Sequence, residues 1–150
     1  MKNIVLFFLL NITTVMCLYS QNNLPNDQQQ KAITALINQY SEAREKMDTV
    51  LLKTILTPDI DQLVSTGEWR NGISAAVQGM LKSSTNSPGT RTLQVDKIRM
   101  LDERIAVVDC RYEIQNADST SRKMWSSFIV AGYKKVWKIS AIRNMLPASQ

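Results

Sequence analysis

Two side chains in the first half of the chain have the chemistry of a donor and a base. Asp61 lies in a strand-like stretch beside Ile60, and if its carboxyl group pointed inward, burial would raise its pKa and make it a general base. Tyr40 could donate a hydrogen bond into a cavity, and a core ring with its hydroxyl at the edge is the alternative. An aspartate on an edge strand can equally face water, so a solvated Asp61 stays open.

The stretch from Gly67 to Gly72 places a carboxylate, an indole and a guanidinium in successive positions. In a functional interpretation, Trp69 packs against a ligand while Glu68 or Arg70 orients the polar end of that ligand. In a structural interpretation, the two glycines serve turns, Trp69 caps the core, and both charged residues are solvated.

Arg143 and Asn144 interrupt the apolar pattern of the last stretch, and strand alternation sends them to opposite faces. One of them must therefore face the side that helices cover. A buried guanidinium needs a carboxylate, which Asp61 or Glu113 could supply. A structural ion pair and an anion-binding arginine are thus two alternative roles for Arg143.

Two further residues complete the candidate binding set. Tyr112 is a donor that could polarise a carbonyl group in a pocket. Trp125 and Trp137 are expected to pack, one against the helix face and the other in either the pocket wall or a dimer interface. The candidate ligand-binding residues are Glu68, Trp69, Tyr112, Trp125, Arg143 and Asn144.

Several classes of chemistry lack the residues that they require. The chain has no histidine, which removes the usual acid–base side chain and metal ligand, and it has neither a Gly-rich phosphate loop nor a Cys/His cluster. The sequence therefore predicts no metal and no cofactor. The 18 basic and 13 acidic residues are mostly scattered, which favours a solvated rim and no nucleic-acid partner.

Residues 1–20 have the pattern of a cleavable signal peptide, with Lys2, an apolar run over residues 4–10 and a small residue before Gln21. Polar residues interrupt the run, which is too short for a membrane span. A periplasmic or secreted protein without membrane contact is predicted, and a lipid anchor at Cys17 is the alternative. Residues 21–27 are expected to form a flexible lead-in. Cys110 is then the only thiol, which leaves no intramolecular disulfide.

Three amphipathic stretches predict three helices. The second is capped by Asp48 and ends before Pro58, and the third opens at Gly72 after two short strands at residues 60–65 and 68–70. Residues 83–90 are expected to form a mobile loop. The first helix has a capping-box pattern at Asp27 and Gln30 and an apolar face of Ile33, Leu36, Ile37, Tyr40, Ala43 and Met47.

Four long strands are predicted to follow, at residues 91–101, 104–115, 122–133 and 136–145. The apolar phase of the first slips near Asp96, which predicts a β-bulge. A sheet that is apolar on both faces must be covered on both, so helices on one side and another layer, such as a second subunit, on the other are expected. The third strand carries Met124, Phe128 and Val130 on one face and Trp125, Ile129 and Tyr133 on the other.

This order of elements, together with three stretches, resembles the nuclear transport factor 2-like superfamily. The stretches are LTPDIDQLVSTGEWRNG at residues 56–72, DCRYEI at 109–114 and VWKISAIRNM at 136–145. Residues 28–147 look similar to the SnoaL-like, SgcJ/EcaC-type exported proteins of uncharacterised function. The resemblance implies an α+β, cone-shaped fold, in which three N-terminal helices pack on a strongly curved antiparallel sheet. It also implies a pocket at the wide end and, frequently, a homodimer across the outer sheet face.

Three functions follow from these patterns. The leading hypothesis is binding of a small, mostly apolar molecule in the cone pocket, without covalent chemistry. The second is an enzyme of the isomerase, cyclase or dehydratase kind, which requires Asp61 to point into the pocket as a general base. Ketosteroid isomerases resemble the chain in fold, but no local motif matches their catalytic residues, so no catalytic assignment is carried over. The third is a homodimeric interaction module that uses the outer sheet face.

Overall fold

The computed structural model describes residues 24–86, 89–116, 118–133 and 136–148. The predicted signal peptide, the alternative anchor Cys17 and the first part of the lead-in lie outside the described residues. No helix within the described ranges is long and apolar enough to cross a membrane.

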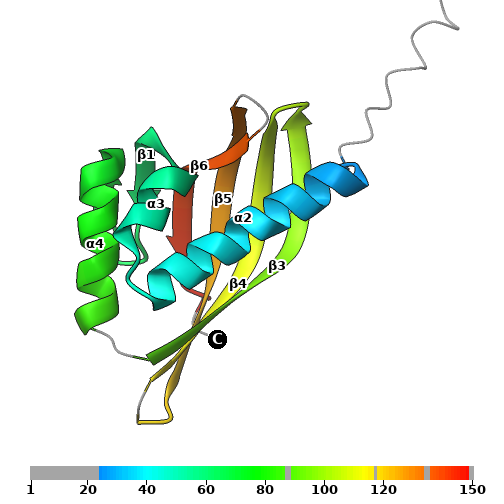
Figure 1. Ribbon diagram of the computed structural model, residues 1–150. Helices are drawn as coiled ribbons and strands as arrows, with labels where there is room; N and C mark the ends of the chain where they lie inside the picture. Colours follow the sequence, from blue (N-terminus) through cyan, green and yellow to red (C-terminus); the bar gives the residue numbers. More distant parts are fainter. Residues whose placement is uncertain (1–23, 87–88, 117, 134–135, 149–150) are drawn as a thin grey trace, which may run out of the picture.

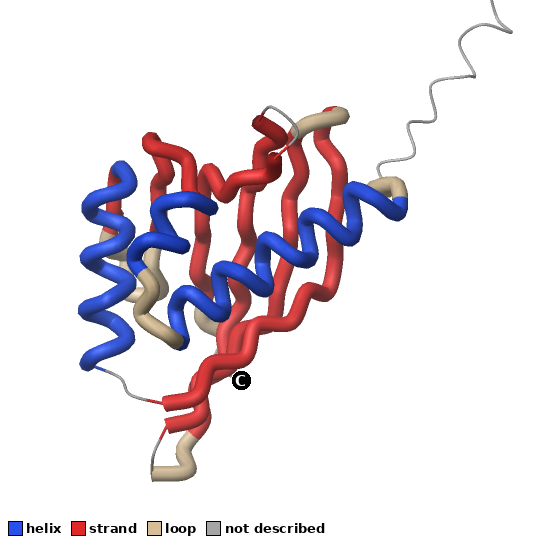
Figure 2. The backbone as a smooth tube through the Cα atoms, viewed as in Figure 1, coloured by secondary structure: helices blue, strands red, loops and turns tan. Residues whose placement is uncertain are grey.

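Three helices cover one side of a six-stranded sheet, so the expected α+β architecture is confirmed. The strand order is β2-β1-β6-β5-β4-β3. Figures 1 and 2 show a curved, unclosed sheet behind the helices, with α2 running diagonally across it. The elements are α2 (Asp27–Glu45), α3 (Thr49–Ile55), β1 (Leu56–Leu63), β2 (Trp69–Asn71), α4 (Gly72–Asn86), β3 (Gly89–Asp102), β4 (Ile105–Asn116), β5 (Ser121–Tyr133) and β6 (Val136–Met145).

The sheet is mixed, whereas the resemblance implied an antiparallel one. Strands β3 to β6 pair antiparallel, as expected. Strand β1 pairs with β6 in parallel, with Gln62 opposite Ile142.

Helix α2 begins at a capping box that lies one residue before the predicted one. Asn26 Oδ1 accepts a hydrogen bond from Gln29 N at 2.8 Å, and Asn26 N donates to Gln29 Oε1 at 3.0 Å. Asp27 and Gln30 have the same spacing, but Asn26 is the residue with the extended backbone (φ −69°, ψ 166°) that an N-cap requires.

Helix α3 is capped by Asp48, as predicted, but it ends earlier than expected. Its last residue is Ile55, and Pro58 lies inside β1. Pairing of β1 with β6 is irregular between Leu56 and Asp61. The missing N–H of Pro58 therefore falls where the ladder is already interrupted.

Most of the loop expected at residues 83–90 is regular structure. Helix α4 continues to Asn86 and β3 starts at Gly89, while residues 87 and 88 lie outside the described ranges. The Ser84 hydroxyl donates to the carbonyl oxygen of Arg44 at 3.5 Å. Contact with the end of α2 thus outweighs the turn preference of the Ser, Thr and Asn residues in this segment.

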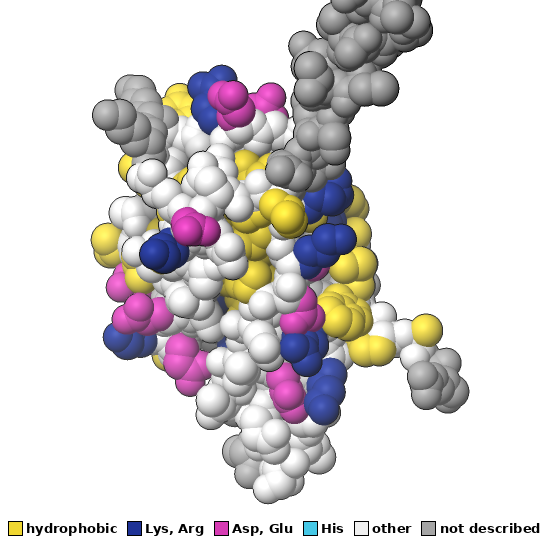
Figure 3. All heavy atoms as spheres, turned by 90° about the vertical axis from the view of Figure 1, so that its right-hand side faces the viewer, with side chains coloured by type: hydrophobic (Ala, Val, Ile, Leu, Met, Phe, Trp, Pro, Cys, Tyr) yellow, Lys and Arg dark blue, Asp and Glu magenta, His cyan; other side chains and the backbone are white. Residues whose placement is uncertain are grey.

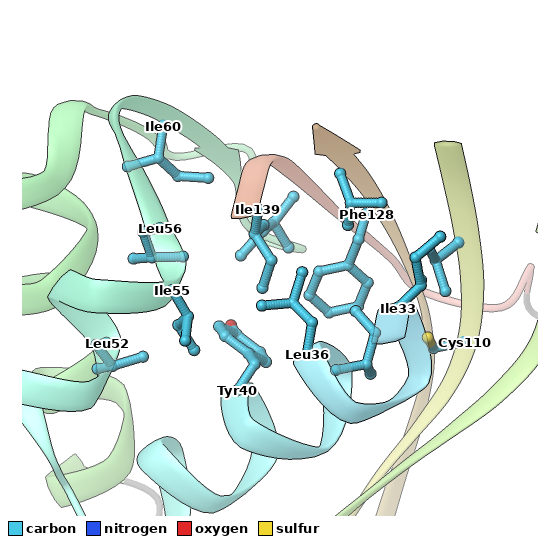
Figure 4. Close-up of a cluster of buried hydrophobic side chains, with 14 of the residues drawn as sticks. Ile33, Leu36, Tyr40, Leu52, Ile55, Leu56, Ile60, Cys110, Phe128 and Ile139 are labelled. Atoms are coloured by element: carbon cyan, nitrogen blue, oxygen red, sulfur yellow. The ribbon is translucent and has the colours of Figure 1, made fainter. Parts of the chain in front are cut away.

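The core lies between the helices and the inner face of the sheet. Figure 4 shows Ile33, Leu36 and Tyr40 of α2 beside Phe128 of β5, and the Tyr40 and Phe128 rings meet edge-on with 5.2 Å between their centroids. The predicted face of α2 is buried except Met47, which lies beyond the helix and is exposed. The alternating apolar residues of β4 are all buried, namely Ala106, Val108, Cys110, Tyr112 and Ile114.

The bulge predicted in β3 is confirmed at Asp96. Val95 is opposite Cys110 and Lys97 is opposite Asp109, which leaves Asp96 unpaired between them. An extra residue of this kind bends the strand and increases its twist, so it contributes to the curvature of the sheet. Burial, followed by the charges of Asp109 and Asp96, raises the pKa of the Cys110 thiol to about 12. Cys110 is therefore the packing residue that its position in the sequence indicates.

The outer face of the sheet is not covered by the described part of the chain. Trp125 and Ile129 of β5 are 44% and 37% exposed, and Ile105 of β4 and Met145 of β6 are exposed beside them. The helices supply the covering that was expected on one side.

Replacement of Phe128 by alanine should lower the free energy of unfolding by about 3–5 kcal/mol, because it empties the centre of the core. The control is Ile129→Ala, since this neighbour points to the opposite face and should cost less than about 1 kcal/mol. Urea denaturation followed by circular dichroism measures both values. Equal losses in the monomer would contradict this assignment of inner and outer faces.

Candidate functional site

Asp61, the candidate general base, forms an ion pair on the outer face of the sheet. Arg143 donates to both carboxylate oxygens of Asp61, at 3.0 and 2.9 Å. The guanidinium also stacks over the Trp69 ring, with 4.8 Å between Cζ and the ring centroid. Arg143 thus pairs with Asp61, one of its two predicted partners, but on the outer face of the sheet and not on the helix-covered side where a pair was expected.

The cone lies on the other side of the same strands. Gln62, next to Asp61 in β1, is buried, and Asn144, next to Arg143 in β6, accepts a hydrogen bond from the buried Ser126 hydroxyl at 2.8 Å. Because side chains alternate along a strand, Asn144 is the residue that faces the helix-covered side. Asp61 does not reach the cone, so the structure does not supply the geometry that a general base there requires.

A hollow lined by residues from the last turns of α2 and α4 opens into the cone. The ends of these two helices lie in the lower part of Figure 1. This hollow, called the mouth below, has a volume of about 240 Å³. A smaller inner chamber of about 10 Å³, enough for one water molecule, lies beneath it between Tyr40, Leu93 and Phe128. The mouth and the inner chamber share three lining residues, which are Arg44, Tyr112 and Asn144.

Arg44, in the last turn of α2, is the buried charge at this junction. Its side chain is 6% exposed, and its guanidinium donates to the Tyr40 hydroxyl at 3.2 Å. Burial raises the pKa of Tyr40 by more than the Arg44 charge lowers it, so the phenol is neutral at neutral pH. Burial on its own lowers the pKa of Arg44, but interactions with Tyr40 and Tyr112 outweigh it and the group stays charged.

Arg70 forms one wall of the mouth. Its Nε donates to Glu68 at 2.9 Å and its guanidinium reaches Gln62 Oε1 at 3.5 Å. A Cβ atom at position 79 of α4 would overlap the Arg70 side chain, so Gly79 is what allows Arg70 to lie against the helix. The hydrogen bond from Arg70 is the main cause that lowers the pKa of Glu68.

Positive charge predominates around the mouth. Arg44, Arg70, Lys82 and Arg122 line it, whereas Glu68 is the one carboxylate among its described lining residues. Elsewhere the charges are mixed, and Figure 3 shows Lys, Arg, Asp and Glu interspersed on the side that carries β3. Cationic groups are therefore concentrated at the mouth, whereas the face shown in Figure 3 carries a mixture of positive and negative charges.

The structure divides the candidate residues from the sequence into two groups. Tyr40, Glu68, Tyr112 and Asn144 line the mouth or the inner chamber. The other four lie on the outer face of the sheet. They are Asp61, Trp69 and Arg143, which touch one another, and Trp125, which is exposed farther along the sheet.

Sequence reasoning missed Arg44, which lines both hollows. A signal was present, because Arg44 follows Tyr40 by four residues and so lies on the apolar face of α2. Arg91, in β3, was also missed. It lines the inner chamber, and its guanidinium donates to the carbonyl oxygens of Gly89 at 3.0 Å and Ser83 at 3.5 Å.

No family model matches the sequence, and no curated protein matches it. Among the described residues, no three His, Cys, Asp or Glu side chains are grouped so that they could hold a metal ion.

Solved structures do match the chain. A domain of unknown function with a cystatin-like fold from Nostoc punctiforme has a TM-score of 0.74 at 15% identity, over 83% of this chain and 81% of that one. A nuclear transport factor 2-like protein of unknown function from Shewanella oneidensis has a TM-score of 0.66 at 18% identity, over 77% and 98%. A putative calcium/calmodulin dependent protein kinase II association domain from Xanthomonas campestris has a TM-score of 0.67 at 13% identity, over 84% and 91%.

These similarities show the fold. The chain has the nuclear transport factor 2-like fold, as its sequence resemblance implied. The SnoaL-like subgroup stays a prediction, because the identities to these structures are too low to distinguish subgroups.

The Asp61–Arg143 pair should stabilise the fold weakly. The two side chains are 37% and 31% exposed, and solvent screening limits the coupling energy of such pairs to about 0.2–1 kcal/mol. A double-mutant cycle with Asp61→Asn and Arg143→Gln, followed by thermal unfolding, measures this energy. The control is Asp59→Asn in the same strand, which should change stability by less than about 0.5 kcal/mol. A coupling energy of several kcal/mol would show that the pair is more buried than described.

Proposed function

We propose that the protein binds a small molecule in the mouth of the cone. The observation that carries the proposal is the hollow of about 240 Å³ at the junction of Arg44, Tyr112 and Asn144. Ligand sites are concave and contain a few converging polar groups that orient the ligand. This volume is at the small end for such sites, which favours a ligand of a few to about ten non-hydrogen atoms.

The lining of the mouth favours a more polar ligand than the sequence suggested. Apolar side chains contribute only Val64, Ile114 and Met124, and the other lining residues are polar or charged. The apolar residues that led to the expectation of an apolar cavity are packed against the helices instead. The proposed ligand therefore has a compact apolar part and at least one polar end.

Binding without chemistry is the form of the proposal that the side chains support. Glu68 is the one carboxylate among the described lining residues, it is engaged by Arg70, and its pKa is lowered by that hydrogen bond. A carboxylate with a lowered pKa is a weak base. Asp61, the base of the enzyme hypothesis, lies on the other face of the sheet.

Binding can be tested by nuclear magnetic resonance with benzoate, benzamide and benzyl alcohol, which share one ring and differ in the polar end. At least one should shift the backbone amide signals of Gln62, Tyr112 and Asn144, which surround the mouth. Val64→Trp should fill the mouth and abolish the shifts, while Val107→Trp on the outer face of β4 should leave them. Shifts confined to the outer face, or none with any of the three compounds, would contradict the proposal.

A second proposed function is self-association through the outer sheet face. Trp125, Ile129, Ile105 and Met145 form an exposed apolar surface there, and such patches on soluble domains mark interfaces. One similar structure, from Xanthomonas campestris, is named as a putative association domain. A homodimer in which two such faces pack together would supply the missing layer.

Sedimentation equilibrium tests this proposal, and the native protein should have the mass of a dimer. Ile129→Lys should give a monomer, because it places two like charges in a desolvated interface. Val50→Lys on the exposed surface of α3 is the matched control and should remain dimeric. A native protein that is monomeric at all concentrations tested would rule out the interface.

A further inference from the structure

Arg44 is a buried cation whose charge is not neutralised by the described residues. The ion pairs of the described chain involve Glu42, Glu68, Asp96, Glu113 and Asp61, and none of these carboxylates pairs with Arg44. The hydrogen bond that its guanidinium makes goes to a neutral phenol, and its Nε is buried without a hydrogen-bond partner. The Tyr112 hydroxyl, which lines both hollows, is also buried without a partner.

Such an arrangement is unfavourable in the empty protein. A buried charge is normally paired with an opposite charge. An unpaired buried charge carries a free-energy cost of desolvation that an exposed charge does not. The C-terminal end of α2 contributes a partial negative charge near Arg44, but that is equivalent to only about half an elementary charge. The groups that lack partners, a guanidinium N–H and a phenol hydroxyl, are both hydrogen-bond donors, so the missing group is an acceptor.

We propose that the ligand of the cone carries a carboxylate and that this carboxylate binds at Arg44, with the Tyr112 hydroxyl as a second donor. This inference rests on the proposed binding function and specifies the ligand class. The guanidinium is planar and presents donors in a fork that matches a carboxylate. The rest of the ligand occupies the mouth, where Ile114 and Met124 offer apolar contact.

The sizes of the two hollows favour a carboxylate over a phosphate. The inner chamber beside Arg44 has a volume of about 10 Å³, which accommodates one oxygen atom of about the size of water. A flat carboxylate can place one oxygen there and the other in the mouth. Inorganic phosphate is tetrahedral and has four oxygens to accommodate around the same guanidinium. The cationic residues Lys82 and Arg122 at the rim would attract either anion.

The inference is tested by comparing the dissociation constants of benzoate, benzamide and inorganic phosphate, measured by titration of the same amide signals. Benzoate should bind the native protein at least about ten-fold more tightly than benzamide, since a hydrogen bond to a charged group is worth that much. Arg44→Gln should remove the difference. Arg111→Gln removes a cation on the outer face, paired with Asp96, and should leave it unchanged.

The outcomes separate this inference from the function on which it rests. If benzamide binds in the mouth as tightly as benzoate, the inference that the ligand carries a carboxylate is wrong, but the proposed small-molecule binding still holds. Phosphate binding as tightly as benzoate would also overturn the preference for a carboxylate. If benzoate, benzamide, inorganic phosphate and benzyl alcohol all fail to bind, the proposed small-molecule binding is itself wrong.

A second variant guards against a purely structural role for Arg44. Arg44→Met keeps an unbranched, apolar stem and removes the guanidinium with its charge. If Arg44 serves a ligand, the ligand-free variant should melt at the same temperature as the native protein or higher, because it no longer buries an unpaired charge. It should also lose the preference for benzoate. A melting temperature lowered by several degrees, with the preference retained, would overturn the inference.

Discussion

The packing of α2 against the inner face of β4 and β5 is the constraint on which the rest of the structure depends. Side chains alternate along a strand, so once Phe128 faces Tyr40, the face of every neighbour in the sheet is determined. Asn144, opposite Ser126, turns into the cone, and Arg143, opposite Ser127, turns out of it. A slip of one residue in this register would exchange the lining of the cone with the outer surface.

The periodic patterns of the sequence predicted the helices and the long strands, and the family resemblance implied the cone, but neither could assign the faces of the last strand. Apolar residues occupy both phases of β6, so nothing within residues 136–145 shows whether Arg143 or Asn144 faces inward. Only the pairing with β5 decides this. The start of α2 was misplaced by one residue because two side-chain pairs have capping-box spacing and only backbone geometry distinguishes them. Arg44 was missed because a helical face that is mostly apolar was treated as core throughout.

The two ends of the cone differ in character, and this difference would let one small domain be stable and also hold the proposed ligand. Near the start of α2 the space between helix and sheet is filled by side chains such as Ile33 and Phe128. At the other end, where α2 and α4 finish, the lining is polar and open. Because the packed core lies at the filled end, the open end can carry polar and charged lining residues such as Arg44.

The position of β6 between β1 and β5 determines when the molecule can fold. Leu56 pairs with Ile139, so the first strand has no neighbour on that side until the last strand has been synthesised. A nascent chain that lacks β6 keeps β1 and the short β2 apart from the meander of β3 to β5. Completion of the sheet therefore depends on long-range contacts between β1 and β6, and topologies rich in such contacts fold slowly compared with helical bundles.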